Sequence, residues 1–303
     1  MGIMNLSAID EQVMFDVLSV PTVSQHEHLL VEFLMDFAKK YDVDASLDDK
    51  GNVYFTKGMV ADGEFFPCVC AHMDTVQDEQ LKWINENKLL EIKIEEYLGR
   101  HYLSCEGFGL GGDDKAGVLI CLTLLKRLPV LKAVFFVEEE MGCLGSEKAE
   151  LGWFKDVGYV LAFDSPGQDC SWACGGARFF DRQFYENYLV ELEQKFTIKK
   201  WCNHPFTDIM FLRQDTSLAC MNIGASYYKY HTNLEYCVAE HMDEAAQMGH
   251  YLIDKLGNNE YLIPYTSRMR DANNEDDKYS LRSSGQDGKK EKVWIINLTL
   301  KIL

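Results

Sequence analysis

Basic residues are scarce in this chain. Its 303 residues include 30 Lys+Arg against 48 Asp+Glu, which gives a formal net charge of −18 at pH 7. Such an excess of acid opposes nonspecific binding to nucleic acid or to an anionic membrane surface, because both carry negative charge. We therefore expect neither as a partner. The charge favours cations instead, including metal ions and protonated amines.

Long apolar runs are also missing. No hydrophobic segment approaches the length that crosses a bilayer, and the N-terminal residues lack the charged-then-apolar pattern of a secretory signal. These absences predict a cytoplasmic protein whose ten cysteines are free thiols. No cysteine spacing is typical of a zinc knuckle or a redox pair, and Cys68, Cys70 and Cys121 lie in apolar surroundings typical of small buried side chains.

The pattern of apolar residues indicates an α/β fold. With 47% hydrophobic and 12% aromatic residues, the chain can form a substantial core. Continuous apolar strands that alternate with helices are typical of a mixed, largely parallel sheet with helices on both faces. Helices are expected at 8–18, 26–40, 115–127, 143–150, 181–194 and 240–256, a hairpin at 43–58, strands at 67–72, 131–138, 157–164 and 218–224, and an antiparallel excursion at 81–107.

The domain organisation predicted from this pattern is simple. Residues 1–265 form one catalytic domain, and residues 266–303 form a polar linker followed by a short strand-like tail. No internal repeat is present.

Five polar segments stand where the chemistry of an α/β fold is expected. Three of them directly follow a predicted strand, and one opens a helix. The segments are "AHMD" (71–74), "GGDDKAG" (111–117), "VEEEMG" (137–142), "AFDSPG" (162–167) and "KYHTNLE" (229–235). Ligands of open parallel sheets collect at the carboxyl ends of the strands, and acids gathered there repel one another unless cations neutralise them. Divalent metal is the simplest explanation.

Each segment also has an ordinary structural explanation. A run of glutamates is usually a solvated surface, Asp164 before Ser-Pro is a good turn former, and His231 can cap or pack. Five such segments together favour the metal site.

In this order, the five segments resemble those of the co-catalytic metallopeptidase clan that includes tripeptide aminopeptidases, related carboxypeptidases and deacylases. The resemblance spans residues 10–257 and implies a zinc exopeptidase-like fold with two divalent cations, zinc first, with manganese or cobalt as alternatives. It implies that Asp74 orients His72, that Glu139 is the general base, and that the peptide bond between Asp113 and Asp114 is cis. The implied ligands are His72, Asp113 and Asp164 for metal one, and Asp113, Glu140 and His231 for metal two.

The implied reaction is hydrolysis of an amide bond by a metal-bound water with Glu139 as base. An acidic protein attracts a protonated amino terminus, which favours an aminopeptidase acting on small peptides. A carboxypeptidase or an N-acyl amino acid deacylase stays open, because an arginine can anchor a carboxylate; the candidates are Arg178, Arg182 and Arg213.

The chain departs from the clan in one respect. Many members carry an inserted lid or dimerisation domain between the Asp ligand and the last His, whereas only residues 165–230 separate Asp164 from His231 here. Without that insertion we expect a monomer or a weak homodimer. The group that stabilises the oxyanion is left open among Tyr227, Tyr228, Tyr230 and His204.

Two functions of other classes compete. Residues 107–112, "GFGLGG", fit the dinucleotide-binding pattern of an oxidoreductase, although two aspartates follow at once and no acid occupies the ribose-binding distance. The other alternative is a nonenzymatic metal-binding module.

Overall fold

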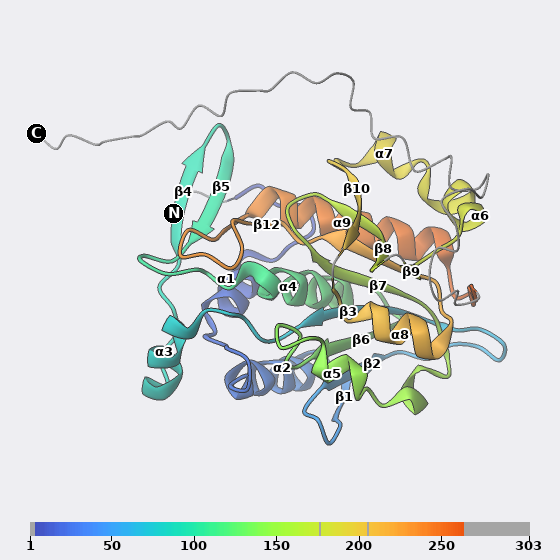
Figure 1. Ribbon diagram of the computed structural model, residues 1–303, viewed down its shortest axis with the longest axis horizontal. Coiled ribbons are helices and arrows are strands. Elements are labelled where there is room, and N and C mark those ends of the chain that lie inside the picture. The colour runs from blue at the N-terminus through green and yellow to red at the C-terminus, as the bar shows by residue number, and fades with distance from the viewer. Residues whose placement is uncertain (1–3, 176, 205, 264–303) are drawn as a thin grey trace, which may run out of the picture. The chain divides into compact units, whose positions relative to one another are not determined.

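The computed structural model describes residues 4–175, 177–204 and 206–263, which fall within one compact unit, Met1–Met269 (Figure 1). The linker and strand-like tail predicted for 266–303 lie outside these residues. No helix in the described part of the chain combines the length and the apolar character needed to span a bilayer.

A mixed sheet forms the centre of the unit. Its strand order is β1-β2-β6-β3-β7-β11-β8-β10, with β9 paired to β8. The central strands β6, β3, β7 and β11 run parallel, whereas the β1–β2 hairpin and the pairing of β11 with β8 are antiparallel. The bounds are β1 Asp44–Leu47, β2 Val53–Lys57, β3 Phe66–His72, β6 Leu131–Phe136, β7 Val157–Ser165, β8 Cys170–Cys174, β9 Ala177–Arg178, β10 Trp201–His204 and β11 Cys220–Gly224. The predicted largely parallel sheet is confirmed.

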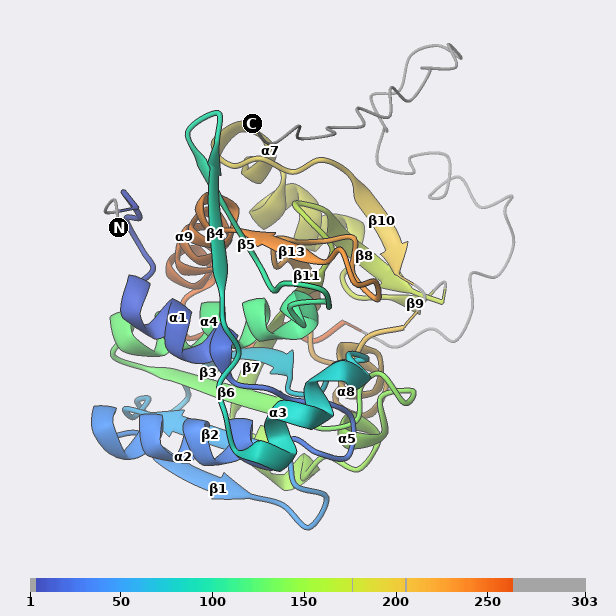
Figure 2. The ribbon, with the colours of Figure 1, turned by 90° about the vertical axis from the view of Figure 1, so that its left-hand side faces the viewer.

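Helices cover both faces of this sheet, as predicted. Figures 1 and 2 show α1, α4 and α9 on one face and α2, α5 and α8 on the other. The bounds are α1 Glu11–Ser19, α2 His28–Tyr41, α4 Gly112–Arg127, α5 Leu144–Glu147, α8 Ile209–Thr216 and α9 Ala239–Leu256. The side chain of Asp10 caps α1 by accepting hydrogen bonds from the amides of Gln12 and Val13.

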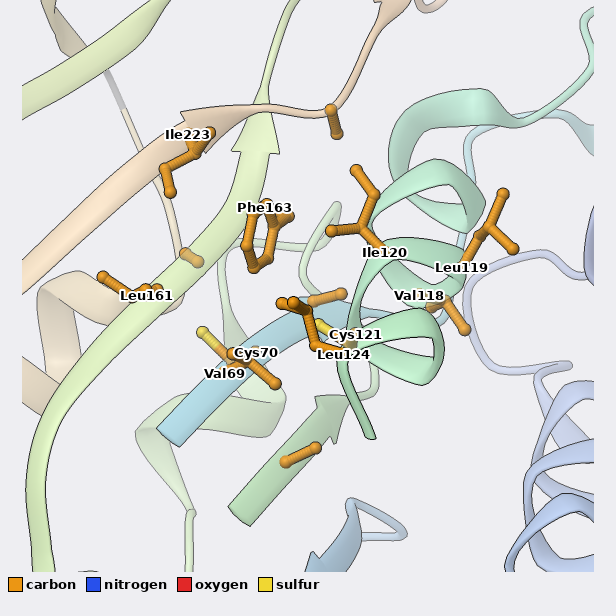
Figure 3. Close-up of a cluster of buried hydrophobic side chains, with 14 of the residues drawn as sticks. Val69, Cys70, Val118, Leu119, Ile120, Cys121, Leu124, Leu161, Phe163 and Ile223 are labelled. Atoms are coloured by element: carbon orange, nitrogen blue, oxygen red, sulfur yellow. The ribbon is translucent and has the colours of Figure 1, made fainter. Parts of the chain in front are cut away.

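Helix α4 is the element that joins the core to the site. Its apolar side chains pack against β3 and β7, where Cys70 and Cys121 are small buried core residues (Figure 3). Gly117 allows this close packing, since a Cβ there would lie 2.0 Å from the carbonyl oxygen of Phe163. The N-terminus of α4 is therefore held directly beside the end of β7.

A small antiparallel sheet lies beside the central one. Its order is β12-β13-β5-β4, and the β4–β5 hairpin extends away from the central sheet (Figure 2). The bounds are β4 Lys93–Tyr97, β5 Arg100–Ser104, β12 Tyr227–Tyr228 and β13 Tyr236–Val238. The strand-like excursion predicted for 81–107 is thus correct only in its second half, because Leu81–Glu86 forms helix α3 after the short turn η1, Asp78–Gln80.

The helix predicted at 181–194 is also only partly correct. The chain forms three short pieces there, and the amide of Val190 bonds to the carbonyl of Tyr185, one residue beyond α-helical spacing. The pieces are α6 Arg182–Phe184, η3 Tyr185–Leu189 and α7 Leu192–Lys195. The remaining short helix is η2, Leu151–Phe154, while β8, β10 and α8 were not predicted.

Candidate metal centre

Three adjacent parallel strands bring three of the five predicted site segments to one edge of the sheet. His72 ends β3, the glutamates follow β6, and Asp164 lies near the end of β7. The strand register places His72 opposite Phe136 of β6 and Cys70 opposite Ala162 of β7. The last residues of these strands are therefore level with one another.

His72 is fully buried and directs one ring nitrogen at carboxylates. Its Nδ1 lies 3.0 Å from the main-chain oxygen of Asp74 and 3.4 Å from its carboxylate, so we assign the ring proton to Nδ1. Nε2 lies 3.2 Å from Asp113, 3.5 Å from Asp164 and 3.9 Å from Glu139. Burial opposes protonation of this ring, yet the surrounding carboxylates raise its pKa well above the usual value.

Asp74 connects His72 with the loop that carries the glutamates. Its two carboxylate oxygens accept hydrogen bonds from the amides of Glu139 at 2.9 Å and Glu140 at 3.2 Å, and from the hydroxyl of Ser24 at 2.7 Å. Burial opposes the charge of Asp74, but His72, the hydroxyl of Ser24 and the amide of Glu139 lower its pKa. Asp74 therefore fixes both the imidazole and the backbone that presents the two glutamates.

Asp113 lies between the two histidines. One carboxylate oxygen is 3.2 Å from His72 Nε2, and the other is 3.2 Å from His231 Nε2. Although burial opposes its charge, both histidines hold the pKa of Asp113 down at about 2. The peptide bond from Asp113 to Asp114 is cis, as the resemblance implied.

The three consecutive glutamates point in different directions. Glu138 leaves the site and pairs with Lys50 Nζ at 2.5 Å, whereas Glu140 Oε1 lies 2.9 Å from His231 Nε2. Glu139 accepts a hydrogen bond from the thiol of Cys143 at 3.3 Å, and burial raises the pKa of its carboxyl to about 9. This arrangement favours Glu139 and Glu140, rather than Glu138 and Glu139, as base and ligand.

Asp164 is held by its neighbour strand. The side-chain amide of Asn222 on β11 bonds to both the N–H and the C=O of Asp164, at 2.9 and 3.1 Å. The hydroxyl of the buried Tyr227 lies 3.5 Å from its carboxylate. The carboxylate is thereby directed toward His72.

Among the described residues, two groups have ligand atoms close enough to hold a cation. They are His72, Asp113 and Glu140, and His72, Asp114 and Asp164, with all ligand atoms of a group within 4.8 Å. Asp114 differs from the predicted ligand sets, but its oxygens accept hydrogen bonds from the amides of His72 and Gly117. These bonds occupy Asp114, so we assign it to holding the start of α4.

The donor set fits the implied cations. Two imidazole nitrogens and the carboxylates of Asp113, Glu140 and Asp164 meet in one cluster, a ligand chemistry that suits zinc and also manganese or cobalt. The close ion pairs that the clustered carboxylates make here are with His72 and His231. Their summed negative charge requires compensation of the kind that divalent cations supply.

Several residues around the centre were not assigned from the sequence. Ser24, Asn222 and Cys143 contact Asp74, Asp164 and Glu139, as described above. Glu235 accepts hydrogen bonds from two amides of the turn before α4, and it stands inside the segment "KYHTNLE" that the sequence had singled out for His231. Its position four residues after the histidine was the available signal.

The open candidates for other roles lie as follows. Tyr228 bonds to His241, Tyr230 is exposed with its ring beside that of His231, and His204 Nδ1 bonds to the carbonyl of Phe206. Of the arginines, Arg182 pairs with Glu186, and buried Arg213 donates to the carbonyl of Arg178.

Comparisons with known proteins support the fold. No model of a known protein family matches the chain. By sequence, the chain is similar to cytosol non-specific dipeptidase of Escherichia coli, with 25% identity over 185 residues, which cover 57% of this chain and 38% of the dipeptidase. The chain thus matches well under half the length of this relative.

Three solved structures with a similar fold are peptidases by name. Aminopeptidase PepT from Bacillus cereus superposes with a TM-score of 0.67 at 14% identity, over 82% of this chain and 100% of that one. A tripeptidase from Staphylococcus aureus gives 0.63 at 12% identity, over 82% and 99%. An aminopeptidase from Desulfurococcus kamchatkensis gives 0.63 at 13% identity, over 82% and 94%. The predicted zinc exopeptidase-like α/β fold is confirmed.

Proposed function

We propose that this protein is a two-metal hydrolase of peptide bonds, and that it acts as an aminopeptidase on small peptides. The observation that carries the proposal is the carboxylate of Asp113, whose two oxygens each lie 3.2 Å from a different histidine nitrogen. A carboxylate that faces two ligand sets can bridge two cations, which suits the mechanism of a two-metal hydrolase.

The residues divide into two ligand sets and one base. His72, Asp113 and Asp164 would hold one cation, and Asp113, Glu140 and His231 the other. When bound, the cations acidify water and polarise the substrate carbonyl. Burial raises the pKa of Glu139 in the metal-free protein. Two cations beside it would favour the ionised form again, so that its carboxylate can accept a proton from the attacking water. It then donates that proton to the leaving amine.

The net charge of the chain favours recognition of an amino terminus. The net charge of −18 attracts a protonated amine and repels a carboxylate. Two of the candidate carboxylate anchors are engaged within the protein, Arg182 by Glu186 and Arg213 by the carbonyl of Arg178. The names of the relatives, which include a dipeptidase, a tripeptidase and aminopeptidases, agree with a small peptide substrate.

A carboxypeptidase or an N-acyl amino acid deacylase is the alternative within the same chemistry. Hydrolysis of a peptide library with free, acetylated or amidated termini separates the possibilities. We expect cleavage of peptides with a free amino terminus and none of acetylated peptides. Cleavage of acetylated peptides or acylated amino acids would contradict the aminopeptidase assignment.

The start of α4 argues against a dinucleotide site. The carboxylate of Glu235 already accepts hydrogen bonds from the amides of Gly111 at 2.6 Å and Asp113 at 3.0 Å. A pyrophosphate bound to the glycine-rich turn would need such amides and would meet carboxylates instead. Zinc stoichiometry with turnover supports the hydrolase, zinc without turnover supports the metal-binding module, and nucleotide affinity without metal supports the oxidoreductase.

The expected assembly is a monomer or a weak homodimer in the cytoplasm. The described residues between Asp164 and His231 include β8, β10 and β11 of the central sheet, which supports the absence of an inserted domain. Light scattering tests this proposal, and the mass of a stable tetramer would contradict it.

A further inference from the structure

Glu235 is a buried carboxylate directly beside the proposed metal centre. Only 1% of the residue is exposed. One carboxylate oxygen accepts hydrogen bonds from the amide of Gly111 at 2.6 Å and from the side chain of Gln77 at 3.2 Å, and the other accepts from the amide of Asp113 at 3.0 Å. These donors occupy both oxygens, so Glu235 is not placed to be a ligand itself.

The contacts of Glu235 join two parts of the chain that each carry a proposed ligand. Asp113 belongs to the glycine-rich turn before α4, and Glu235 holds the backbone of that turn on both sides of Gly112. His231 belongs to the turn between β12 and β13, and the amide of Glu235 closes this turn by bonding to the carbonyl of Thr232 at 3.2 Å. One residue therefore fixes the backbone near both ligands.

Close packing makes this connection rigid. A Cβ at Gly112 would lie 2.4 Å from the sulfur of Cys237 and 3.6 Å from Glu235 Oε1. The glycine-rich turn thus lies directly against the start of β13, with no room for it to shift toward the strand.

We propose that Glu235 is a positioning residue that sets the separation of Asp113 and His231, and thereby the affinity of the second cation site. The inference rests on the proposed two-metal function. Residues that orient metal ligands typically contribute about 10–100-fold to metal affinity, and Glu235 acts on the bridging ligand.

The test is the variant Glu235→Gln. Its side chain keeps one carbonyl oxygen but turns an amino group toward one of the two backbone amides, so that two donors face each other. The variant is first freed of metal with a chelator and then titrated with zinc in a calorimeter. We expect the zinc affinity of one site to be close to wild type and that of the other to be about 10–100-fold weaker. The absorption of bound cobalt should change as well, because the ligand geometry changes.

A matched control is Glu240→Gln at the start of α9. Glu240 also accepts a backbone amide, that of His101 at 2.9 Å, and it pairs with the ring of the same residue on β5. This variant should bind zinc at both sites as wild type does. A weakened second site in both variants would overturn the specific role of Glu235.

The outcomes separate this inference from the proposed function. Wild-type protein that binds no zinc would overturn both. If the wild-type protein has two zinc sites and Glu235→Gln has the same two affinities and the same cobalt spectrum, the role of Glu235 alone is overturned. This holds even if the melting temperature of the variant falls. If Glu235→Gln does not fold, Gln77→Leu removes one donor to the same carboxylate, and an unchanged second site in that variant would also overturn the inference.

Discussion

Replacing Glu139 by glutamine should stop catalysis and leave the metal centre intact. The glutamine keeps the size and shape of the side chain and can still accept the hydrogen bond from Cys143. It cannot accept a proton from water. Glu139 belongs to neither of the two groups of described residues whose ligand atoms are close enough to hold a cation, so neither proposed cation depends on it as a ligand.

The size of the effect follows from the role of a general base. Removal of such a base lowers the rate by about 10²–10⁴-fold. At about 1.4 kcal/mol for each factor of ten, this corresponds to roughly 3–5 kcal/mol of lost transition-state stabilisation. The loss should fall on kcat, while KM stays within about threefold of wild type, because substrate binding does not require proton transfer.

The neighbouring variant Glu140→Gln should behave in the opposite way. Glu140 Oε1 lies 2.9 Å from His231 Nε2, and both residues belong to the second proposed ligand set. Loss of an anionic ligand leaves the cation there less neutralised, so its occupancy should fall and excess zinc or manganese should restore part of the activity.

Both variants are assayed for zinc content by elemental analysis beside kcat and KM on a dipeptide or tripeptide with a free amino terminus. Glu138→Gln is the control, because Glu138 pairs with Lys50 outside the centre. If Glu139→Gln loses zinc while Glu140→Gln retains two ions, the roles within "VEEEMG" shift by one residue and the reasoning is refuted.

Four further outcomes are expected. Cys143→Ala should lower kcat about threefold to tenfold at unchanged zinc content, because Glu139 loses a hydrogen-bond donor. Cys143→Ser should restore kcat, and equal kcat values for wild type and Cys143→Ala would exclude that role. Chelation of zinc should lower the melting temperature, since zinc at 100 times its Kd contributes about 2.7 kcal/mol to the free energy of unfolding; an unchanged melting curve would contradict metal binding. Lys115→Met should destabilise the fold by about 1–3 kcal/mol in denaturant titrations, because the buried Nζ donates to the carbonyls of Leu18 and Val20 at the end of α1. Asp243→Asn should lower the free energy of unfolding by a similar amount at pH 7. Burial opposes the charge of Asp243, but hydrogen bonds from three amides near the N-terminus lower its pKa. The contribution of Asp243 to stability is therefore present above about pH 4 and is lost as the pH falls through the lowered pKa. The stability difference between this variant and wild type should therefore shrink below pH 4, and a constant difference would refute the assignment.

The edge of the sheet where the proposed ligands meet was predictable from the sequence. The apolar runs of β3, β6 and β7 end directly before His72, Glu138 and Asp164. Parallel strands bring such ends to the same edge of the sheet. The polarity change at each strand end is a local signal, which a single sequence contains.

Other features depend on contacts that leave no local signal. Strand β10, Trp201–His204, is short, only partly buried and without a continuous apolar run, so its pairing with β8 is visible only in the folded chain. The helix predicted at 181–194 is interrupted where the amide of Val190 bonds to the carbonyl of Tyr185, five residues back instead of four. Glu235 lies 124 and 122 residues from Gly111 and Asp113 along the chain. Its partners there are backbone amides, which every residue except proline has, so the sequence does not mark them.

The wide spacing of the proposed ligands along the chain bears on how bound cations would affect folding kinetics. His72 and Asp113 are 41 residues apart, and Glu140 and His231 are 91 apart, so the centre exists only after β3, β6, β7 and the β12–β13 turn have come together. An unfolded chain pays the loop-closure entropy of these segments before any cation can bridge them. Contacts that form late stabilise the native state without stabilising the folding transition state. Zinc should therefore slow unfolding strongly while leaving the refolding rate nearly unchanged, so that the protein with bound zinc is kinetically protected for as long as its cations stay in place.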